Sequence, residues 1–168
     1  MSSAFLILVG SFSPMISTLN FTSSPPSLSL VSQTPSGTSP SWLLSNPTNT
    51  SIIYATDEVD SGALNSLVLD HSSGKLTPVA SIPTQGGGPT HIGLVNNGTQ
   101  LGVANYGGGS AFFTTLDQDL LHFGSPQLVS FASAGSSNAH EVKIIFSPKQ
   151  YLIFLSLGRS IWRSRFGF

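Results

Sequence analysis

The sequence predicts an all-β fold, and more narrowly a partial β-propeller of about three four-stranded blades. Three observations lead to this prediction. The 168 residues are 39% apolar but only 8% charged, and they are rich in residue types that favour turns between strands, such as Gly and Pro. Similar stretches recur at a fixed spacing along the chain. Each repeated unit contains four short apolar runs separated by turn residues, which is typical of a propeller blade.

The repeat is clearest in two stretches of sequence. SPSWLLSNPTNTSIIYA begins at Ser39, and GPTHIGLVNNGTQLGVAN begins at Gly88. Trp42 and His91 lie 49 positions apart. His140 lies a further 49 positions after His91, which indicates a third copy at the same spacing. Periods of about 40 to 50 residues are typical of propellers and solenoids, and runs of strand length favour a propeller over a helical array.

In chain order, the opening residues predict three strands, at Ala4 to Val9, Ser17 to Phe21 and Leu28 to Ser32. The first full unit predicts four strands, at Trp42 to Leu44, Ser51 to Thr56, Ala63 to Leu69 and Thr77 to Ile82. We expect units at residues 1–37 (strands of a split closing blade), 38–86 (a blade), 87–135 (a blade) and 136–168 (the start of a further blade with an aberrant tail). A propeller ring typically needs four to eight blades. We therefore expect a fragment, a truncated gene product or one part of an oligomeric ring, with self-association through open blade edges.

Composition and charge exclude several classes of partner. With six Lys and Arg against seven Asp and Glu, the chain lacks the basic cluster that binding to nucleic acid requires. The run AFLILVG at the N-terminus is too short to cross a bilayer and no positive charge precedes it, so we expect a buried strand, no membrane association and a cytoplasmic protein. Cysteine is absent, which excludes disulfides and thiolate chemistry.

Five stretches occur in a characteristic order: ILVGSF, NPTNTSIIYATDE, SSGKLTPVASIPTQGGGPTHI, LGVANYGGGS and AHEV. In this order they resemble the lactonase family of seven-bladed β-propellers, which includes bacterial 6-phosphogluconolactonases and fungal carboxy-cis,cis-muconate cyclases. The amino-acid sequence of these stretches is most similar to that of the fungal members. The resemblance covers roughly residues 4 to 158 and implies that the chain is the N-terminal part of a longer fold. The tail SLGRSIWRSRFGF departs from the family pattern, so we expect a gene-model error or an early stop there.

Two histidines are the candidate catalytic residues. His91 and His140 occupy equivalent repeat positions at the start of the innermost strand, which lines the central channel of a propeller. Imidazole transfers protons near neutral pH. The resemblance implies that His140, in AHEV, matches a histidine of the family. Because Glu141 follows His140 directly, we expect only one of these two side chains to face the channel. Trp42 occupies the same position in the first copy, so a packing role for the histidines stays equally open.

Polar residues at the ends of the second strands are the candidate substrate-binding groups, namely Asp57, Glu58, Asn105 and Tyr106. A structural role at the strand ends suits them as well. We expect His71 and His122 to be structural, and the glycine triplets at 86–88 and 107–109 to form turns, not phosphate loops. The spacing of the His, Asp and Glu residues predicts neither a metal site nor a cofactor.

Two functions stay open. The resemblance implies a small-molecule lactone or organic acid as substrate, with the parent protein either hydrolysing a sugar lactone or acting as a muconate-cyclising isomerase. The alternative is a non-catalytic propeller fragment or interaction module. Lys75 is the only cation before Lys143, and all three arginines, Arg159, Arg163 and Arg165, fall in the aberrant tail. Anionic substrates need cationic groups, so we expect the chain alone to be inactive.

Overall fold

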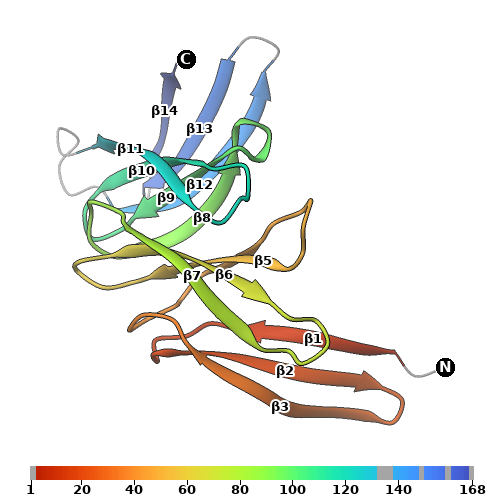
Figure 1. The fold of residues 1–168 in the computed structure, drawn as a ribbon. Coiled ribbons are helices and arrows are strands. Elements are labelled where there is room, and N and C mark those ends of the chain that lie inside the picture. The colour runs from red at the N-terminus through yellow and green to blue at the C-terminus, as the bar shows by residue number, and fades with distance from the viewer. Residues whose placement is uncertain (1–2, 132–137, 148–149, 158–159, 167–168) are drawn as a thin grey trace.

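A computed structural model describes residues 3–131, 138–147, 150–157 and 160–166, whose strands form four antiparallel sheets (Figure 1). The first sheet has the order β1 (Ala4–Val9), β2 (Met15–Ser23), β3 (Pro26–Pro35). The second has the order β4 (Leu43–Ser45), β5 (Ile52–Asp57), β6 (Ala63–Leu69), β7 (Leu76–Pro83). The third runs β8 (Pro89–Val95), β9 (Gln100–Asn105), β10 (Ser110–Leu116), β11 (Phe123–Ser130), with a 3-10 turn at Asn96–Gly98. The fourth has β12 (Ala139–Ser147), β13 (Gln150–Leu157) and β14 (Ser160–Phe166).

The strands predicted for the first full unit are confirmed to within one residue at either end. Side chains of turn residues explain why the strands stop there. Asn46 Oδ1 accepts the backbone N–H groups of Thr48 at 2.9 Å and Asn49 at 3.2 Å, which closes the turn between β4 and β5. Asp70 Oδ1 accepts the backbone N–H of Ser72 at 2.8 Å in the turn between β6 and β7.

The middle strands of the second and third sheets are buried on both faces. In β5, Ile52 and Tyr54 face the third sheet, whereas Ile53 and Ala55 face the first. Successive side chains of a strand point to opposite faces, so a strand covered on both sides needs a continuous apolar run. The uninterrupted IIYA sequence meets this requirement.

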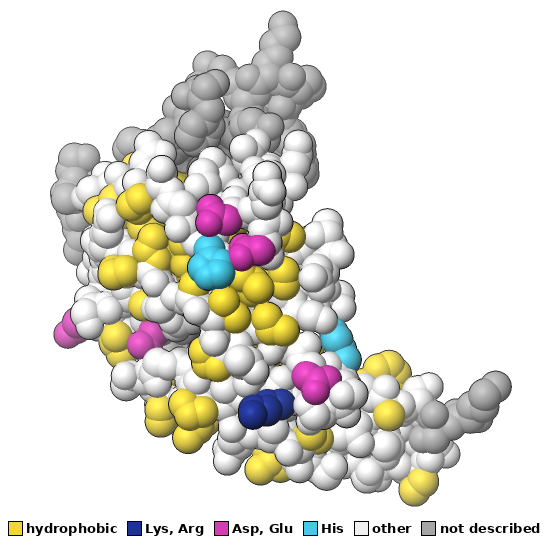
Figure 2. All heavy atoms as spheres, in the orientation of Figure 1, with side chains coloured by type: hydrophobic (Ala, Val, Ile, Leu, Met, Phe, Trp, Pro, Cys, Tyr) yellow, Lys and Arg dark blue, Asp and Glu magenta, His cyan; other side chains and the backbone are white. Residues whose placement is uncertain are grey.

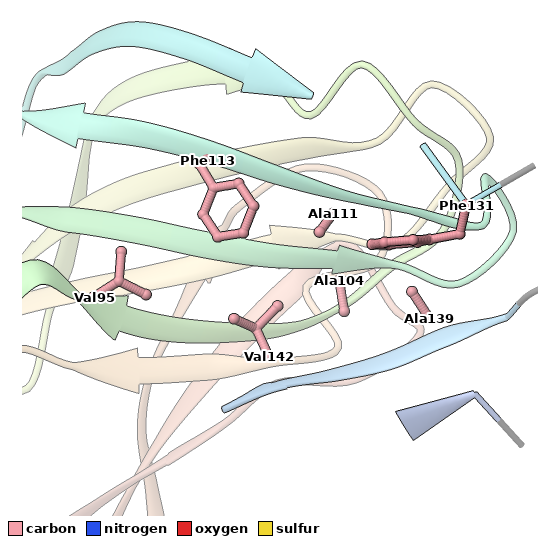
Figure 3. Packing of buried hydrophobic residues seen from close by; sticks show 7 residues of the cluster. All are labelled: Val95, Ala104, Ala111, Phe113, Phe131, Ala139 and Val142. Atoms are coloured by element: carbon pink, nitrogen blue, oxygen red, sulfur yellow. The ribbon is translucent and has the colours of Figure 1, made fainter. Parts of the chain in front are cut away.

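Three apolar clusters hold the four sheets together, and each joins one sheet to the next. Ile16, Ile53 and Leu67 belong to the cluster between the first and second sheets. Tyr54, Leu101 and Phe112 belong to the cluster between the second and third. Figure 3 shows the cluster between the third and fourth sheets, formed by Val95, Ala104, Ala111, Phe113, Phe131, Ala139 and Val142. Strand β8 contacts both β4 and β12, so the first strands of three consecutive sheets lie together. This arrangement is a partial β-propeller, and the predicted fold class is confirmed.

A pair of glycines lets the fourth sheet approach the third. Gly93 of β8 and Gly102 of β9 are cross-strand partners. A Cβ at Gly102 would lie 2.9 Å from both Phe113 Cε1 and Val142 Cγ1, and a Cβ at Gly93 would lie 2.9 Å from the Val142 carbonyl oxygen. The absence of side chains at these two positions gives Val142 its place in the cluster.

Hydrogen bonds add to the contact between the second and third sheets. The loop between β10 and β11 reaches the second sheet, where Tyr54 Oη donates to the Leu120 carbonyl at 2.7 Å and Ser66 Oγ donates to the Leu121 carbonyl at 2.7 Å. Both side chains are buried, so these bonds satisfy polar groups that would otherwise be costly to bury.

The surface carries few charges. Figure 2 shows one face on which uncharged and apolar side chains predominate over acidic and basic ones. Within the described ranges, the chain contains no helix with the length and apolarity needed to span a bilayer.

Candidate active site

A pocket of about 560 Å³ lies where the starts of β8 and β12 meet the segments flanking β4 and β5. It is lined by aromatic, hydroxyl, imidazole and carboxylate side chains, namely Phe12, Ser41, Trp42, Glu58, Thr90, His91, His140 and Glu141. Another pocket of about 570 Å³, next to the first sheet, is lined mainly by apolar side chains, with His71 as its titratable residue. The pocket around His91 and His140 therefore holds most of the side chains that could transfer protons or bind a substrate.

The structure brings both candidate catalytic histidines, His91 and His140, into this one pocket. It also places Glu141 there, so the expectation that only one of His140 and Glu141 faces the channel is wrong. The pairing explains why. Ala139 pairs with Leu157 but Val142 pairs with Leu155, so β12 carries one extra residue as a bulge at positions 140 and 141. A bulge interrupts the alternation of side chains, which lets two consecutive residues reach the same side.

His91 is half-buried and held from two sides. Its ring lies 4.4 Å from the Trp42 ring, centroid to centroid, and its Nδ1 accepts the backbone N–H of Val142 at 3.3 Å. Burial lowers the pKa of His91, with nearby Glu141 opposing this shift and Lys143 and His140 adding to it. The imidazole is therefore favoured in its neutral form, and because Nδ1 accepts a hydrogen bond, the proton sits on Nε2.

His140 is exposed and makes a different aromatic contact. Its ring meets the Tyr106 ring edge to face, with centroids 5.5 Å apart and an interplanar angle of 89°. Tyr106, one of the predicted substrate-binding residues, thus supports a candidate catalytic residue from the end of β9. Of the two imidazoles, that of His140 is the freer to exchange protons with water in the pocket.

Two carboxylates give the pocket a negative side. Glu58 follows β5, and Glu141 lies in the β12 bulge. Glu141 Oε1 lies 3.2 Å from Lys143 Nζ, and this ion pair is largely exposed, so its charges are screened by water. Glu58 is the one predicted substrate-binding residue that lines the pocket itself.

Asp57 has a structural position. Its Oδ1 accepts the backbone N–H groups of Thr38 at 2.9 Å and Ser39 at 2.7 Å. Gly37, with a φ of 82°, packs so tightly against the carboxylate that a Cβ there would lie 2.5 Å from Asp57 Cγ. The carboxylate thereby fixes the loop between the first and second sheets, and it does not line the pocket.

Asn105 is fully buried and also has structural partners. Its Nδ2 donates to the Thr84 carbonyl and to Ser110 Oγ, both at 3.1 Å. The glycine triplets beside it lie against each other, because Gly108 N–H donates to the Gly87 carbonyl at 2.9 Å. A Cβ at Gly86 would lie 2.4 Å from Asn105 Nδ2, so the close backbone approach requires glycine.

The other candidate groups lie away from the pocket. His71 is in the turn between β6 and β7, and His122 Nδ1 lies 2.5 Å from Asp119 Oδ2 in the loop between β10 and β11. Arg159, Arg163 and Arg165 fall outside the residues whose side chains the structure describes. Across the described ranges, the His, Asp and Glu side chains form no group of three able to hold a metal ion.

Ser41, Thr90 and Phe12 also line the pocket, although they were not among the predicted site residues. Ser41 and Thr90 both face the pocket and lie 49 positions apart, so the repeat offset that aligned Trp42 with His91 also aligned these two hydroxyls. Trp42, considered only as a packing residue, is 40% exposed. No repeat signal marked Phe12, because it belongs to the segment between β1 and β2.

A family model and several solved structures are similar to this chain over most of its length. The family model described as lactonase, 7-bladed β-propeller, matches residues 6–159. A solved structure of a periplasmic gluconolactonase from Pseudomonas aeruginosa superposes with a TM-score of 0.83 at 21% identity, covering 97% of this chain and 50% of that one. A putative 6-phosphogluconolactonase from Bacteroides fragilis gives a TM-score of 0.77 at 23% identity, covering 91% and 46%.

A second putative 6-phosphogluconolactonase, from Bacteroides uniformis, gives a TM-score of 0.72 at 22% identity, covering 98% of this chain and 55% of that one. At these identities the likeness shows a common fold. The chain spans about half the length of these three solved proteins. No curated protein sequence matches it.

Proposed function

Because the chain belongs to the lactonase family of seven-bladed β-propellers, we propose that the pocket around His91 and His140 contributes to a site that hydrolyses a sugar lactone. The observation that carries this proposal is the pair of imidazoles in one pocket. His91 is half-buried and accepts a backbone hydrogen bond at Nδ1, and burial lowers its pKa, whereas His140 is exposed. These two states suit two different roles in acyl transfer to water.

His140 is the proposed general base. Its imidazole takes a proton from a water molecule as the water oxygen attacks the carbonyl carbon of the lactone. When the tetrahedral intermediate collapses, the bond between the carbonyl carbon and the ring oxygen breaks. The proton on His140 then passes to the departing oxygen, which leaves a hydroxy acid and a neutral imidazole.

His91 is the proposed oxyanion donor. With Nδ1 occupied by the Val142 amide, Nε2–H is available to the carbonyl oxygen, which gains negative charge in the tetrahedral intermediate. A donor fixed before the reaction starts needs no reorganisation as that charge develops. Protonation of His91 would break the bond to Val142, so a lowered pKa favours the state with this geometry.

The test is lactone hydrolysis by the full chain, measured as acid release in a pH-stat against the spontaneous rate. We expect a rate above background that falls at least tenfold in His140→Gln and in His91→Gln. His71→Ala is the matched control, since it removes an exposed histidine from a turn away from the pocket. A rate at background, or one unchanged in both glutamine variants, would favour a non-catalytic binding module.

A further inference from the structure

We propose that the pocket wall built by this chain takes an uncharged polyol lactone and disfavours a phosphorylated one. The inference rests on the proposed function for the choice of a lactone, and it adds the charge class of the substrate. It comes from the aromatic, hydroxyl and carboxylate groups that line the pocket.

The aromatic part of the wall is exposed. Trp42 is 40% exposed although one part of its ring packs on His91, and Phe12 is 78% exposed. Large apolar rings left in contact with water mark a surface that gains free energy when it is covered. The C–H face of a sugar ring is flat and apolar enough to cover an indole, while its hydroxyl groups stay in contact with polar neighbours.

Polar neighbours of the right kind surround these rings. Ser41 and Thr90 add hydroxyl groups to the lining. Thr90 Oγ1 donates to the Ala104 carbonyl at 3.4 Å and Ser41 Oγ shares a hydrogen bond of 3.3 Å with Thr56 Oγ1, and each oxygen keeps the capacity to accept from a sugar hydroxyl. The carboxylates of Glu58 and Glu141 accept hydrogen bonds, so they suit sugar hydroxyl donors. The Glu58 carboxylate repels a phosphate group brought into the pocket, and Glu141 adds the part of its charge that Lys143 does not balance.

Among the described side chains, neither lysine lines the pocket. Lys75 lies in the turn between β6 and β7, and the Lys143 ammonium group is paired with the Glu141 carboxylate. In the glycine triplets, Gly108 N–H donates to the Gly87 carbonyl and Gly88 N–H donates to the Val59 carbonyl, so these two N–H groups are already used within the chain. His91 is favoured in its neutral form, so it adds no standing positive charge.

The experiment compares two hydrolysis-stable probes, D-glucono-1,5-lactam and its 6-phosphate. Each is titrated into the full chain carrying Trp162→Phe, so that the tryptophan emission reports on Trp42. We expect the neutral lactam to bind at least tenfold more tightly than the phosphate. In the double variant Glu58→Gln, Glu141→Gln this preference should shrink below threefold. His71→Ala is the control and should leave both affinities unchanged.

Three results would overturn the inference: a 6-phosphate that binds as tightly as the lactam, a preference unchanged in the glutamine double variant, or no binding of either probe. If circular dichroism shows that the double variant does not fold, the affinities of the two probes for the Trp162→Phe chain still test the charge preference. Binding of the lactam without turnover of D-glucono-1,5-lactone would refute the proposed hydrolysis and leave the charge class intact. Turnover of the 6-phosphate lactone that is faster than turnover of the neutral lactone would support the proposed hydrolysis and refute the proposed charge class.

Discussion

The backbone amide of Val142 donates a hydrogen bond to Nδ1 of His91 over 3.3 Å, which ties β12 of the fourth sheet to β8 of the third. The two residues are 51 positions apart in sequence. One bond thereby links the packing of two sheets to the tautomer of a candidate catalytic residue.

Stability should depend on pH through His91. Burial holds its pKa in the folded chain below the ordinary value of 6.5, so as the pH falls the unfolded chain takes up the proton first. The His91 contribution to stability is therefore fully present above about pH 6.5, declines below it, and levels off below the folded pKa. Urea unfolding at a series of pH values measures this effect.

The variant His91→Asn keeps a hydrogen-bond acceptor but does not titrate. The difference in stability between wild type and His91→Asn should therefore change between pH 7.5 and pH 5.5, while Glu141, His140 and Lys143 remain common to both chains. A difference that stays constant across this range would contradict the assigned burial effect.

Asp57→Ala should lower stability by about 1–2 kcal/mol, because the backbone N–H groups of Thr38 and Ser39 lose their acceptor. Affinity for a bound lactam should stay the same, since Asp57 does not line the pocket. Chemical denaturation and the tryptophan titration measure the two quantities. Weakened binding at unchanged stability would return Asp57 to the substrate-binding set.

Asn105→Ala should lower the free energy of unfolding by about 1–3 kcal/mol, because the buried Thr84 carbonyl and Ser110 Oγ lose the Asn105 Nδ2 donor. Tyr106→Phe is the matched variant at the neighbouring position. It keeps the ring that meets His140, so thermal unfolding and lactone turnover should both stay near wild type. Loss of turnover in Tyr106→Phe would instead assign a role to the hydroxyl group.

Gly102→Ala should destabilise the contact between the third and fourth sheets by about 1–3 kcal/mol, because a Cβ would lie 2.9 Å from both Phe113 and Val142. Hydrogen exchange should quicken in β12 more than in β5. Gly98→Asn is the control, since nothing lies within 4 Å of a Cβ at Gly98 and Asn tolerates its φ of 84°. Uniform loss of protection across all sheets would argue against a local effect.

The outer face of the first sheet should drive self-association. Phe21 of β2 lies between its cross-strand partners Phe5 of β1 and Leu28 of β3. Leu28 and Leu30 are 59% and 58% exposed. Exposed apolar area of this kind favours burial against another surface, and we expect a second copy of the chain to supply it. Sedimentation velocity should show association that increases with concentration and is reduced in the double variant Leu28→Lys, Leu30→Lys. Monomers at every concentration would refute this expectation.

Most of the fold was predictable because the apolar runs and turns are local signals. The Asn46 and Asp70 turns mark strand ends, and the IIYA run of β5 marks a strand buried on both faces. The repeat offset also predicted that His91 and His140 occupy equivalent places. The equivalent strand β8 also has a register shift, between Pro89 and His91, but neither bulge could be read from the sequence because a bulge depends on the register with the neighbouring strand. A structural role for Asp57 was open from the sequence, but its partners, 18 and 19 residues away, could not be identified from it.

Each apolar cluster joins one sheet to the next, and this has a consequence for cooperativity. The free energy of unfolding is then close to a sum of sheet terms and nearest-neighbour interface terms, as in a one-dimensional array. A change at Ile16 reaches β8 through β5 and β6 of the second sheet. Sheets with a neighbour on each side open last, and the first sheet, covered on one face, opens before them. Since His91 lies at an interface between sheets, the pocket shares the stability of that interface.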